Sequence, residues 1–345
     1  MNRTLDVKFN VLRDNSFYTE LIAVSPPALR MDNSGEIKLS MAGDFIDDPA
    51  IDWLKDEVQP ILIIDGEETP LGVLLPATVR RAEDETTKSV HVELYDRSWK
   101  VRDNLTETHI HLNAGTNYLD AVNQLLVESN ITLVQPTPTT AALAEAREDW
   151  DVGTSRLTII NQLLSEINYN PLWFNNQGMA ILEPATVPRA ENIDHVLDGA
   201  EVKSLIIPAI TSEMDLFNAP NVFICVCSNA DKSGVLVARS ENTNPQSPLS
   251  IPRRGRRIAQ VTKVDNIADI DALQEYANRQ RNNSMMGAEV IEIETALHPG
   301  YGAYDVTAIN YGDISGICAE TAWEMELVTG GTMKHTLEKV VYTFE

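Results

Sequence analysis

Residues 115–126 read GTNYLDAVNQLL and residues 153–164 read GTSRLTIINQLL, so nearly the same segment occurs twice, 38 positions apart. Both copies begin with glycine and threonine, and apolar residues then recur at the spacing of a helix. We predict that Thr116 and Thr154 cap the two helices. The predicted buried stripes are Leu119, Val122, Leu125 and Leu126 in the first helix, and Leu157, Ile160, Leu163, Leu164 and Ile167 in the second.

The second helix leads into NYNPLWFNNQGMAILEP (168–184), which predicts a hairpin with its turn at Asn175–Gly178. Between the helices we expect a strand at Ile131–Val134 and then a connecting loop over residues 135–149. Together these elements predict a small α/β domain over residues 104–188. A capped helix followed by an aromatic hairpin indicates packing rather than a reaction centre.

Residues 1–103 contain short apolar runs separated by turn signals, which predict an N-terminal β-barrel domain. In the clearest hairpin, Pro60–Pro76, ILII leads into the turn Asp65–Glu68 and LGVLL returns. A second pair, Val73–Arg81 with Ser89–Tyr95, is joined by the charged turn Ala82–Lys88. The remaining predicted strands are Asp6–Leu12, Thr19–Val24 and Glu36–Ser40, the last followed by a turn around Gly43.

Residues 189–345 are again rich in strand patterns and predict a second β-barrel domain with one inserted helix. The helix is expected over Ile267–Asn283, with Asp269 or Asp271 near its start. Its predicted buried face is Ile270, Leu273, Tyr276 and Ala277. The predicted strands are Glu201–Ile210, Asn221–Ser228, Gly234–Ser240, Ala288–Thr295, Ala303–Ile309, Ile317–Val328 and Thr332–Phe344. The fold class is therefore α+β, mainly β, with two antiparallel β-barrel-like domains flanking the small α/β domain.

The net charge of −24 is the outstanding feature of the composition. Such a surface repels nucleic acid and anionic membranes, and it also forms a wall past which DNA slides without binding. Cys225 and Cys227 are expected on one face of a strand, and with Cys318 they make no disulfide framework, which favours synthesis in a reducing compartment. The N-terminus lacks an apolar signal core, and no run of 18 apolar residues occurs, so we expect a soluble protein.

The order of these segments resembles the baseplate hub, or tail-tip hub, proteins of tailed phages and related contractile injection systems. Four stretches carry the resemblance, and they cover nearly the whole chain in order. They are IDWLKDEVQPILIIDGEETPLGVLLPATV (51–79), VHVELYDRSWKVRDNL (90–105), WDVGTSRLTIINQLLSEINYNPLWFNNQGMAILEP (150–184) and ALQEYANRQRNNSM (272–285). Each motif is structural, and their joint order is the evidence.

The resemblance implies two barrels related by pseudo-symmetry, so that a homotrimer presents six barrels in a ring. Such a hub joins a sixfold tail tube, or a distal tail protein, to a threefold spike, and also meets the tape measure protein. DNA passes through its channel without specific binding, and neither a cofactor nor a membrane is implied. The expected location is the virion tail, assembled in the bacterial host cytoplasm. Because the chain ends at VVYTFE (340–345), we expect the spike to be a separate protein.

Catalytic signatures are weak throughout the sequence. His109 and His111 lie two apart and are candidates for a metal pair, but no third ligand is evident, so ordinary polar positions are the other interpretation. Paired acids such as Asp149 with Asp151, and Glu324 with Glu326, stand among many other acids and favour solvated faces over a glycosidase site. The sequence contains no nucleophile elbow, P-loop or dinucleotide-binding fingerprint. We therefore expect no catalytic or metal site.

The basic cluster Arg253, Arg254, Arg256 and Arg257 is the single such cluster in the acidic chain. It is a candidate contact with a second subunit or neighbouring protein, because arginine pairs well with carboxylates such as those of DFIDDPAIDWLKDE (44–57). A phosphate or DNA site and a solvated loop are the alternatives.

Two other functions remain open at this stage. The first is a tail-associated cell-wall hydrolase whose α/β domain is catalytic, which would need a nucleophile or an acid pair converging in a cleft. The second is a carbohydrate-binding receptor-recognition protein, which would need clustered exposed aromatic residues. All five tryptophans instead lie in apolar or strand contexts: Trp53, Trp99, Trp150, Trp173 and Trp323.

Overall fold

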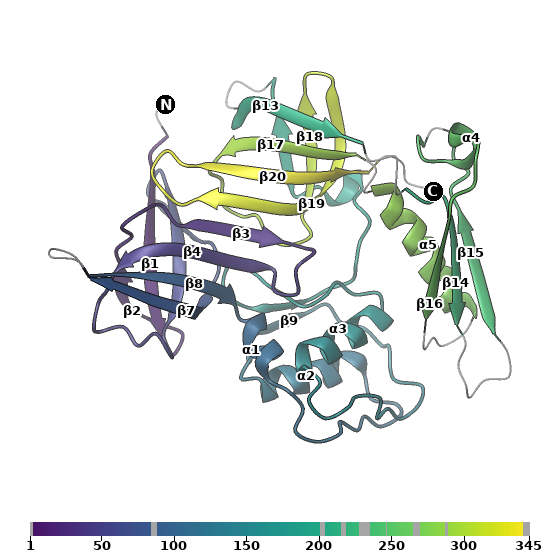
Figure 1. Cartoon of the computed structure of the whole chain (residues 1–345), viewed down its shortest axis with the longest axis horizontal. Coiled ribbons are helices and arrows are strands. Elements are labelled where there is room, and N and C mark those ends of the chain that lie inside the picture. Colours follow the sequence, from purple (N-terminus) through teal and green to yellow (C-terminus); the bar gives the residue numbers. More distant parts are fainter. Residues whose placement is uncertain are drawn as a thin grey trace. The chain divides into compact units, whose positions relative to one another are not determined.

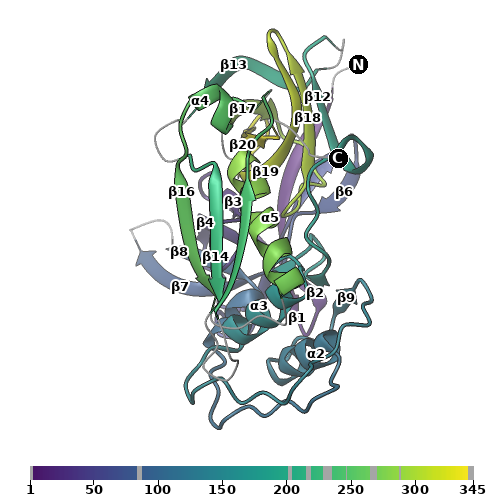
Figure 2. The same cartoon turned by 90° about the vertical axis from the view of Figure 1, so that its right-hand side faces the viewer.

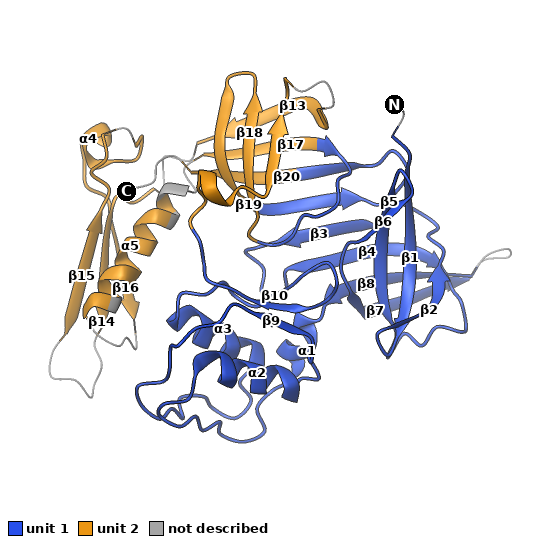
Figure 3. Cartoon of the chain, turned by 180° about the vertical axis from the view of Figure 1, so that it is seen from behind, with its two compact units in different colours: residues 1–186, 295–303, 321–334 blue, residues 187–294, 304–320, 335–345 orange. Residues whose placement is uncertain are grey.

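The computed structural model describes residues 3–83, 88–200, 204–214, 219–227, 235–245, 247–264, 270–286 and 289–340. The protein is mainly β, with antiparallel sheets and few helices, as expected (Figure 1). Its residues form two compact units (Figure 3). Unit 1 comprises residues 1–186, 295–303 and 321–334, and unit 2 comprises residues 187–294, 304–320 and 335–345. The division into three domains, 1–103, 104–188 and 189–345, stays a prediction.

A β-barrel forms the first part of unit 1. Its strands follow one another in the order β4-β8-β7-β5-β1-β2, and each is antiparallel to the next. Their bounds are β1 Leu5–Arg13, β2 Ser16–Leu21, β4 Leu39–Ile46, β5 Glu57–Ile64, β7 Leu74–Glu83 and β8 Lys88–Asp96. Beyond β2 the chain returns to β4, where Val24 N–H donates to the Asp44 carbonyl and Ile46 N–H donates to the Ile22 carbonyl. These bonds close the barrel, and Phe9 and Phe45 meet inside it at 5.4 Å between ring centroids.

Two further strands complete this part of unit 1. Strand β3 (Ala28–Asp32) pairs with β4 and with residues 322–326 of β19 (Ile314–Glu326). The predicted Asp65–Gly66 turn is confirmed, but its return strand is β6 (Glu67–Pro70), and LGVLL instead leads into β7.

The predicted turn at Gly43 is wrong because this glycine lies within β4. A Cβ there would come within 2.8 Å of Pro27, so the residue is set by close packing rather than by a turn.

The second part of unit 1 is the small α/β fold that contains the repeated sequence. Its elements are α1 Ser98–Asp103, α2 Tyr118–Glu128, β9 Val134–Pro136, α3 Arg156–Glu166, β10 Trp173–Phe174 and β11 Ala180–Leu182. The predicted hairpin is confirmed, since β10 and β11 pair around the turn 175–178. Strand β9 lies three residues later than expected and pairs in parallel with β11. Helix α1 was not expected from the sequence, and it begins where the buried Asp96 carboxylate accepts the Ser98 N–H.

The sequence repeat is a structural repeat. Gly115 and Gly153 both have positive φ, +82° and +90°, which explains why glycine stands at each position. The two helices end on Asn130 and Asn168, whose φ values are 59° and 60°. The next residues close both ends in the same way, because Ile131 N–H donates to the Leu126 carbonyl and Tyr169 N–H to the Leu164 carbonyl, each at 2.9 Å.

The helix caps lie one residue later than predicted. The Asn117 side chain accepts the Leu119 N–H, and the Ser155 side chain accepts the Leu157 N–H. Thr154 instead donates its hydroxyl to the Asp151 carbonyl. All three are residue types that favour caps, so the sequence pattern alone did not separate the threonine from its neighbour.

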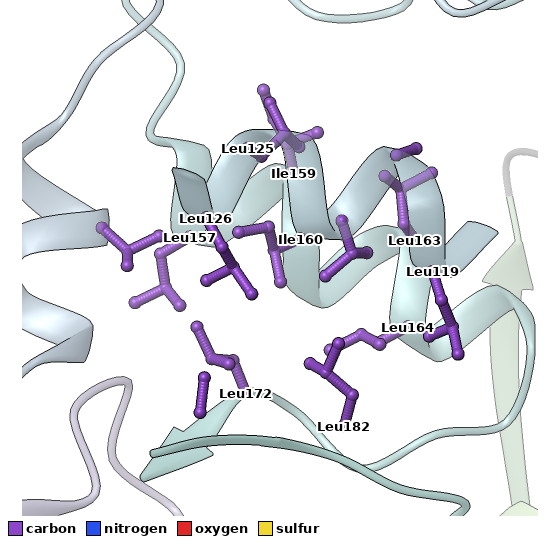
Figure 4. Close-up of a cluster of buried hydrophobic side chains, with 14 of the residues drawn as sticks. Leu119, Leu125, Leu126, Leu157, Ile159, Ile160, Leu163, Leu164, Leu172 and Leu182 are labelled. Carbon is purple, nitrogen blue, oxygen red and sulfur yellow. The ribbon is translucent and has the colours of Figure 1, made fainter. Parts of the chain in front are cut away.

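The two helices share one hydrophobic core, shown in Figure 4. Both predicted stripes are buried, except that Ile167 is partly buried at the edge of the core, and Ile159 is buried in addition. Leu172 and Leu182 from the hairpin segment close the core from the strand side. The aromatic hairpin thus packs on the helices, as the sequence indicated.

Unit 2 contains a curled sheet with the order β12-β18-β19-β20-β17-β13. The bounds are β12 His195–Asp198, β13 Ile206–Glu213, β17 Val290–Ala296, β18 Val306–Tyr311, β19 Ile314–Glu326 and β20 Thr332–Lys339, and the short helix η1 is Ala190–Asn192. Leu197 from the first strand in this order and Ile206 and Ile210 from the last pack in the same core, so the sheet curls around it. Within the described residues the predicted strands are confirmed to within a few positions, while β12 was not predicted.

The rest of unit 2 is a three-stranded sheet covered on one face by a helix. The sheet order is β15-β14-β16, with β14 Val222–Cys227, β15 Leu236–Glu241 and β16 Ala259–Val264, and the helices are α4 Ile251–Arg254 and α5 Ile270–Met286. Cys225 and Cys227 share the buried face, as predicted, and contact a core that includes Leu273 and Ala277. Ile270 was wrongly assigned to that face. It stands in the first turn of α5 and is 45% exposed, while Asp269 lies outside the described residues.

The α/β core generates a prediction about stability. Leu163 is fully buried between the helices, so Leu163→Asp would leave a charge without a partner in that core and destabilise the protein by about 3 kcal/mol or more. Thermal unfolding monitored by circular dichroism should show a much lower midpoint. Thr158→Asp places the same charge on the exposed side of α3 and serves as the control. Equal midpoints for the two variants would contradict the packing described here.

Candidate functional site

The predicted arginine cluster lies at the short helix α4 and the segment after it. The Ser250 side chain accepts the Arg253 N–H at the start of α4, and Gly255 ends the helix in the left-handed conformation. Arg253, Arg256 and Arg257 are exposed, whereas Arg254 is half-buried and donates to the Ala219 carbonyl at 2.7 Å. The cluster is therefore an exposed basic surface, and the Arg254–Ala219 hydrogen bond anchors it to the rest of the fold.

Two arginines converge on one carboxylate at this surface. Glu241 at the end of β15 accepts from Arg257, and Arg239 of the same strand lies 2.6 Å from the same carboxylate oxygen. Arg239 and Glu241 are two residues apart on a strand, so both lie on the face opposite α5. Arg239 was not among the predicted site residues, since a single arginine in a strand gives no signal in the sequence.

Four of the six carboxylates in the acidic stretch 44–57 have side-chain partners inside unit 1. The Asp44 carboxylate pairs with His91 and that of Asp47 with Arg81, each at 2.9 Å. Asp56 pairs with Arg13, and Glu57 with Arg97 and Lys100. A contact between the arginine cluster and this stretch stays a prediction. Asp48 and Asp52 are the carboxylates of the stretch that would make it.

An arginine brace shapes the turn within this stretch. Arg13 donates to both Asp56 carboxylate oxygens, at 2.8 and 2.7 Å, and also to the Ala50 carbonyl at 3.1 Å. The same carboxylate accepts the Asp52 N–H at 2.8 Å. These bonds hold a turn whose Trp53 is buried and whose Leu54 is 94% exposed. Hydrogen bonds from Arg13 lower the pKa of the Asp56 carboxyl below its ordinary value.

A second, buried ion pair joins the barrel to the α/β fold within unit 1. Glu57 accepts from Arg97 at 2.5 and 3.1 Å and from Lys100 at 2.9 Å. Arg97 also donates to the Asn15 side chain in the β1–β2 turn and to the Gly178 carbonyl in the β10–β11 turn. Burial tends to raise the pKa of the Glu57 carboxyl, but the hydrogen bonds and charges of Arg97 and Lys100 outweigh it and hold the pKa below its ordinary value.

The histidine pair is not brought together with a third ligand. His111 lies 2.5 Å from the Glu148 carboxylate and 3.1 Å from the Asn113 side chain. His109 and His111 line an open cavity of about 400 Å³ beside α2. In the described part of the chain, no three His, Cys, Asp or Glu residues are placed to hold a metal ion.

Of the paired acids, Asp149 forms an ion pair, whereas Asp151, Glu324 and Glu326 are exposed. Arg147 pairs with Asp149 and with the Glu166 carboxylate at 2.8 Å. Tyr118 donates to Glu166, and burial together with that negative charge raises the pKa of Tyr118 to about 12. Glu324 and Glu326 lie on the exposed side of β19, whose Trp323 and Met325 are buried. Neither the pair Asp149 and Asp151 nor the pair Glu324 and Glu326 lines the cavity beside α2 or a second cavity beside Arg97.

Among the described helices, none is both long and apolar enough to span a bilayer.

Comparison with known proteins was made by sequence and by structure. No protein-family model and no curated protein matches the sequence. Solved structures match along nearly the whole chain. A tail protein from Neisseria meningitidis MC58 superposes with a TM-score of 0.69 at 12% identity and covers 97% of both chains. The 43 kDa tail protein of prophage MuSo2 from Shewanella oneidensis gives a TM-score of 0.68 at 9% identity, covering 97% of this chain and 99% of that one.

A third similar structure is the prophage tail protein gp18 from Listeria monocytogenes EGD-e. It gives a TM-score of 0.58 at 13% identity and covers 96% of this chain and 94% of that chain. At such low identity the likeness concerns the fold, and the fold is that of phage tail proteins. The resemblance inferred from the order of the sequence motifs is confirmed at this level.

The Arg13–Asp56 brace predicts a pH-dependent contribution to stability. Because the pKa of Asp56 is lowered in the folded protein, its contribution is present above the unfolded-state pKa and is lost as pH falls through the folded-state pKa. Asp56→Asn should cost about 2 kcal/mol at neutral pH, and the difference from wild type should shrink below about pH 4. Thermal midpoints measured from pH 2 to pH 7 test this. Glu20→Gln, at an exposed position of β2, is the control, and a difference that does not depend on pH would refute the brace.

Proposed function

We propose that this chain is a structural component of a phage tail, the hub of its tip or baseplate. The observation that carries the proposal is the likeness in fold to a tail protein and to a prophage tail protein, each over 97% of this chain. The closed barrel of unit 1 and the curled sheet of unit 2 support it, because a hub of this kind needs two β-barrels in each chain.

The proposed assembly is a homotrimer. Two barrels in each of three chains make a ring of six similar modules, which matches a sixfold partner on one side and a threefold partner on the other. The sixfold partner would be the tail tube or a distal tail protein, and the threefold partner a spike protein. The tape measure protein would contact the same ring. The chain would then reside in the virion tail after assembly in the bacterial host cytoplasm.

The proposed ring surrounds a channel through which DNA leaves the virion. The net charge of −24 supports this proposal, because a negatively charged channel wall repels DNA. The repulsion acts over about one Debye length, about 8 Å at physiological ionic strength. The proposal places carboxylates on the channel wall and the arginine cluster at residues 253–257 away from it. It assigns the chain no enzymatic activity, because Asp149 is engaged by Arg147 and the structural neighbours are tail proteins.

Copy number in purified tails tests the proposed hub. Quantitative mass spectrometry against isotope-labelled peptides should give three copies of this chain per tail, because closed threefold symmetry sets the number. A tail-tube protein present in multiples of six serves as the internal standard. One copy or six copies per tail, or absence from tails, would reject the hub.

A separate experiment tests the non-enzymatic role. Asp149→Asn and Asp151→Asn remove the predicted acid pair that precedes the second copy of the repeat, and we expect tails of normal number and phage of normal infectivity. The outcome that favours a tail-associated cell-wall hydrolase is normal assembly with infectivity reduced by a factor of about 100 or more, as expected for loss of a catalytic acid or base. Thr158→Asn, on the exposed side of α3, is the matched control.

A further inference from the structure

Within the residues that the structure describes, the three-stranded sheet of unit 2 is covered by a helix on one face. Helix α5 packs against the face that carries Cys225, Cys227 and Ala238. Figure 2 looks onto the opposite face, with β14, β15 and β16 in front and α5 behind them. An amphipathic sheet usually leaves polar residues on its open face, so the side chains found there are informative.

The open face of this sheet is apolar at its centre. The register places Val226 beside Val237 and Lys263, and Ile224 beside Arg239 and Val261. Val237 is 54% exposed and Val261 is 60% exposed. We name Ile224, Val226, Val237 and Val261 the valine face. Adjacent aliphatic side chains that remain in water across three strands mark a surface that another protein covers.

The charges around the valine face are unlike those of the rest of the chain. Residues 235–264 contain six arginines and lysines and one carboxylate, a net charge of +5 in a chain of net charge −24. Arg239 and Lys263 stand at opposite corners of the valine face, and Arg257 joins Arg239 at Glu241. The surface therefore fits an occupant that combines an apolar projection with carboxylates.

The same chain carries a surface of that kind in unit 1. Leu54 is almost fully exposed on the turn that the Arg13–Asp56 brace holds in place. Asp48 and Asp52 precede Leu54 in the same turn, and the exposed Lys55 follows it. Tyr18 of β2 is 42% exposed and lies under Arg13. A braced turn loses little conformational freedom on binding, so its leucine is well suited to act as an anchor.

We propose that the valine face of one chain binds the Leu54 turn of a second copy of the same chain. Leu54 packs on Val237 and Val261, while Asp48 and Asp52 face Arg239 and Lys263. The contact is heterologous, because it joins different surfaces of the two copies, and such contacts build rings when the rotation closes. The proposal rests on the trimeric hub proposed above and names the contact that would hold its subunits together.

DNA is the other polyanion that a basic surface could bind, but this surface suits it less well. The aliphatic centre, which includes the exposed side chains of Val237 and Val261, offers nothing to a phosphate. A second copy meets both the apolar and the basic parts of the surface.

Disulfide trapping in assembled tails tests the contact directly. Tails are purified from cells that produce the Leu54→Cys, Val237→Cys double variant, oxidised, and separated under non-reducing conditions. The three native cysteines are buried, so background linkage is low. We expect covalent multimers with these two cysteines, and none with the control pair Val127→Cys, Val237→Cys, because Val127 is exposed to a similar extent on α2.

Charge reversal provides a second, independent measurement. Arg239→Glu with Lys263→Glu, or Asp48→Lys with Asp52→Lys, should lower incorporation into tails about tenfold, because like charges would meet in the contact. All four reversals in one chain should restore incorporation to near the wild-type amount. Circular dichroism of each variant confirms that it is folded.

The outcomes separate this contact from the hub itself. Three wild-type copies per tail, with no Leu54–Val237 linkage and no rescue by the combined reversals, would overturn the contact and leave the hub standing. Wild-type chains absent from tails would overturn the hub first. Normal incorporation of the Arg239→Glu, Lys263→Glu variant, together with a selective loss of DNA binding or ejection, would assign the face to DNA and reject the proposal.

Discussion

The buried ion pair between Arg97 and Glu57 is the interaction on which unit 1 depends. One guanidinium group binds a carboxylate of β5, the side chain of Asn15 in the β1–β2 turn and the Gly178 carbonyl in the β10–β11 turn. Both side chains are 8% exposed, and loss of Glu57 would leave the buried charge of Arg97 unpaired at a cost of roughly 3–5 kcal/mol. The barrel and the α/β fold are thereby held in one geometry.

The sequence predicted the fold best where a local pattern and its packing agree. The repeated segment predicted both helices and their stripes because leucine and isoleucine at helical spacing have one way to be buried together. The Asp65–Gly66 turn and the paired strands β7 and β8 were equally local. Predictions failed where a distant contact decides. Gly43 lies within a strand because β4 pairs there with β8, and the close approach of Pro27 explains why the residue is glycine. ILII pairs with β6, so LGVLL meets β5 one step farther along, where Leu71 N–H donates to the Pro60 carbonyl and Leu74 pairs with Val58. Barrel closure between residues 22–24 and 44–46 has no signal in the sequence.

The candidate site was predicted in part, for the same physical reason. The run of arginines at 253–257 is visible as a cluster, and its charge stands out against an acidic chain. The valine face is not visible in this way, because Val237 and Val261 look like ordinary strand residues until the register and the position of α5 show which face is covered. Leu54 in turn becomes notable once the Arg13–Asp56 brace shows that its exposure is enforced. Which side chains are exposed and which charges are paired depends on the whole fold, so these two surfaces could not be predicted from residue types alone.

The proposed hub places the barrel of unit 1 and the curled sheet of unit 2 in equivalent positions of a ring. A reconstruction of the tail tip by electron cryomicroscopy, computed without imposed symmetry, tests this claim most directly. The account predicts a threefold-symmetric layer of three chains in which the barrel of unit 1 alternates with the curled sheet of unit 2 around the channel. A layer of six chains that each contribute one barrel to the ring, or a tip in which this chain lies outside the channel wall, would contradict it.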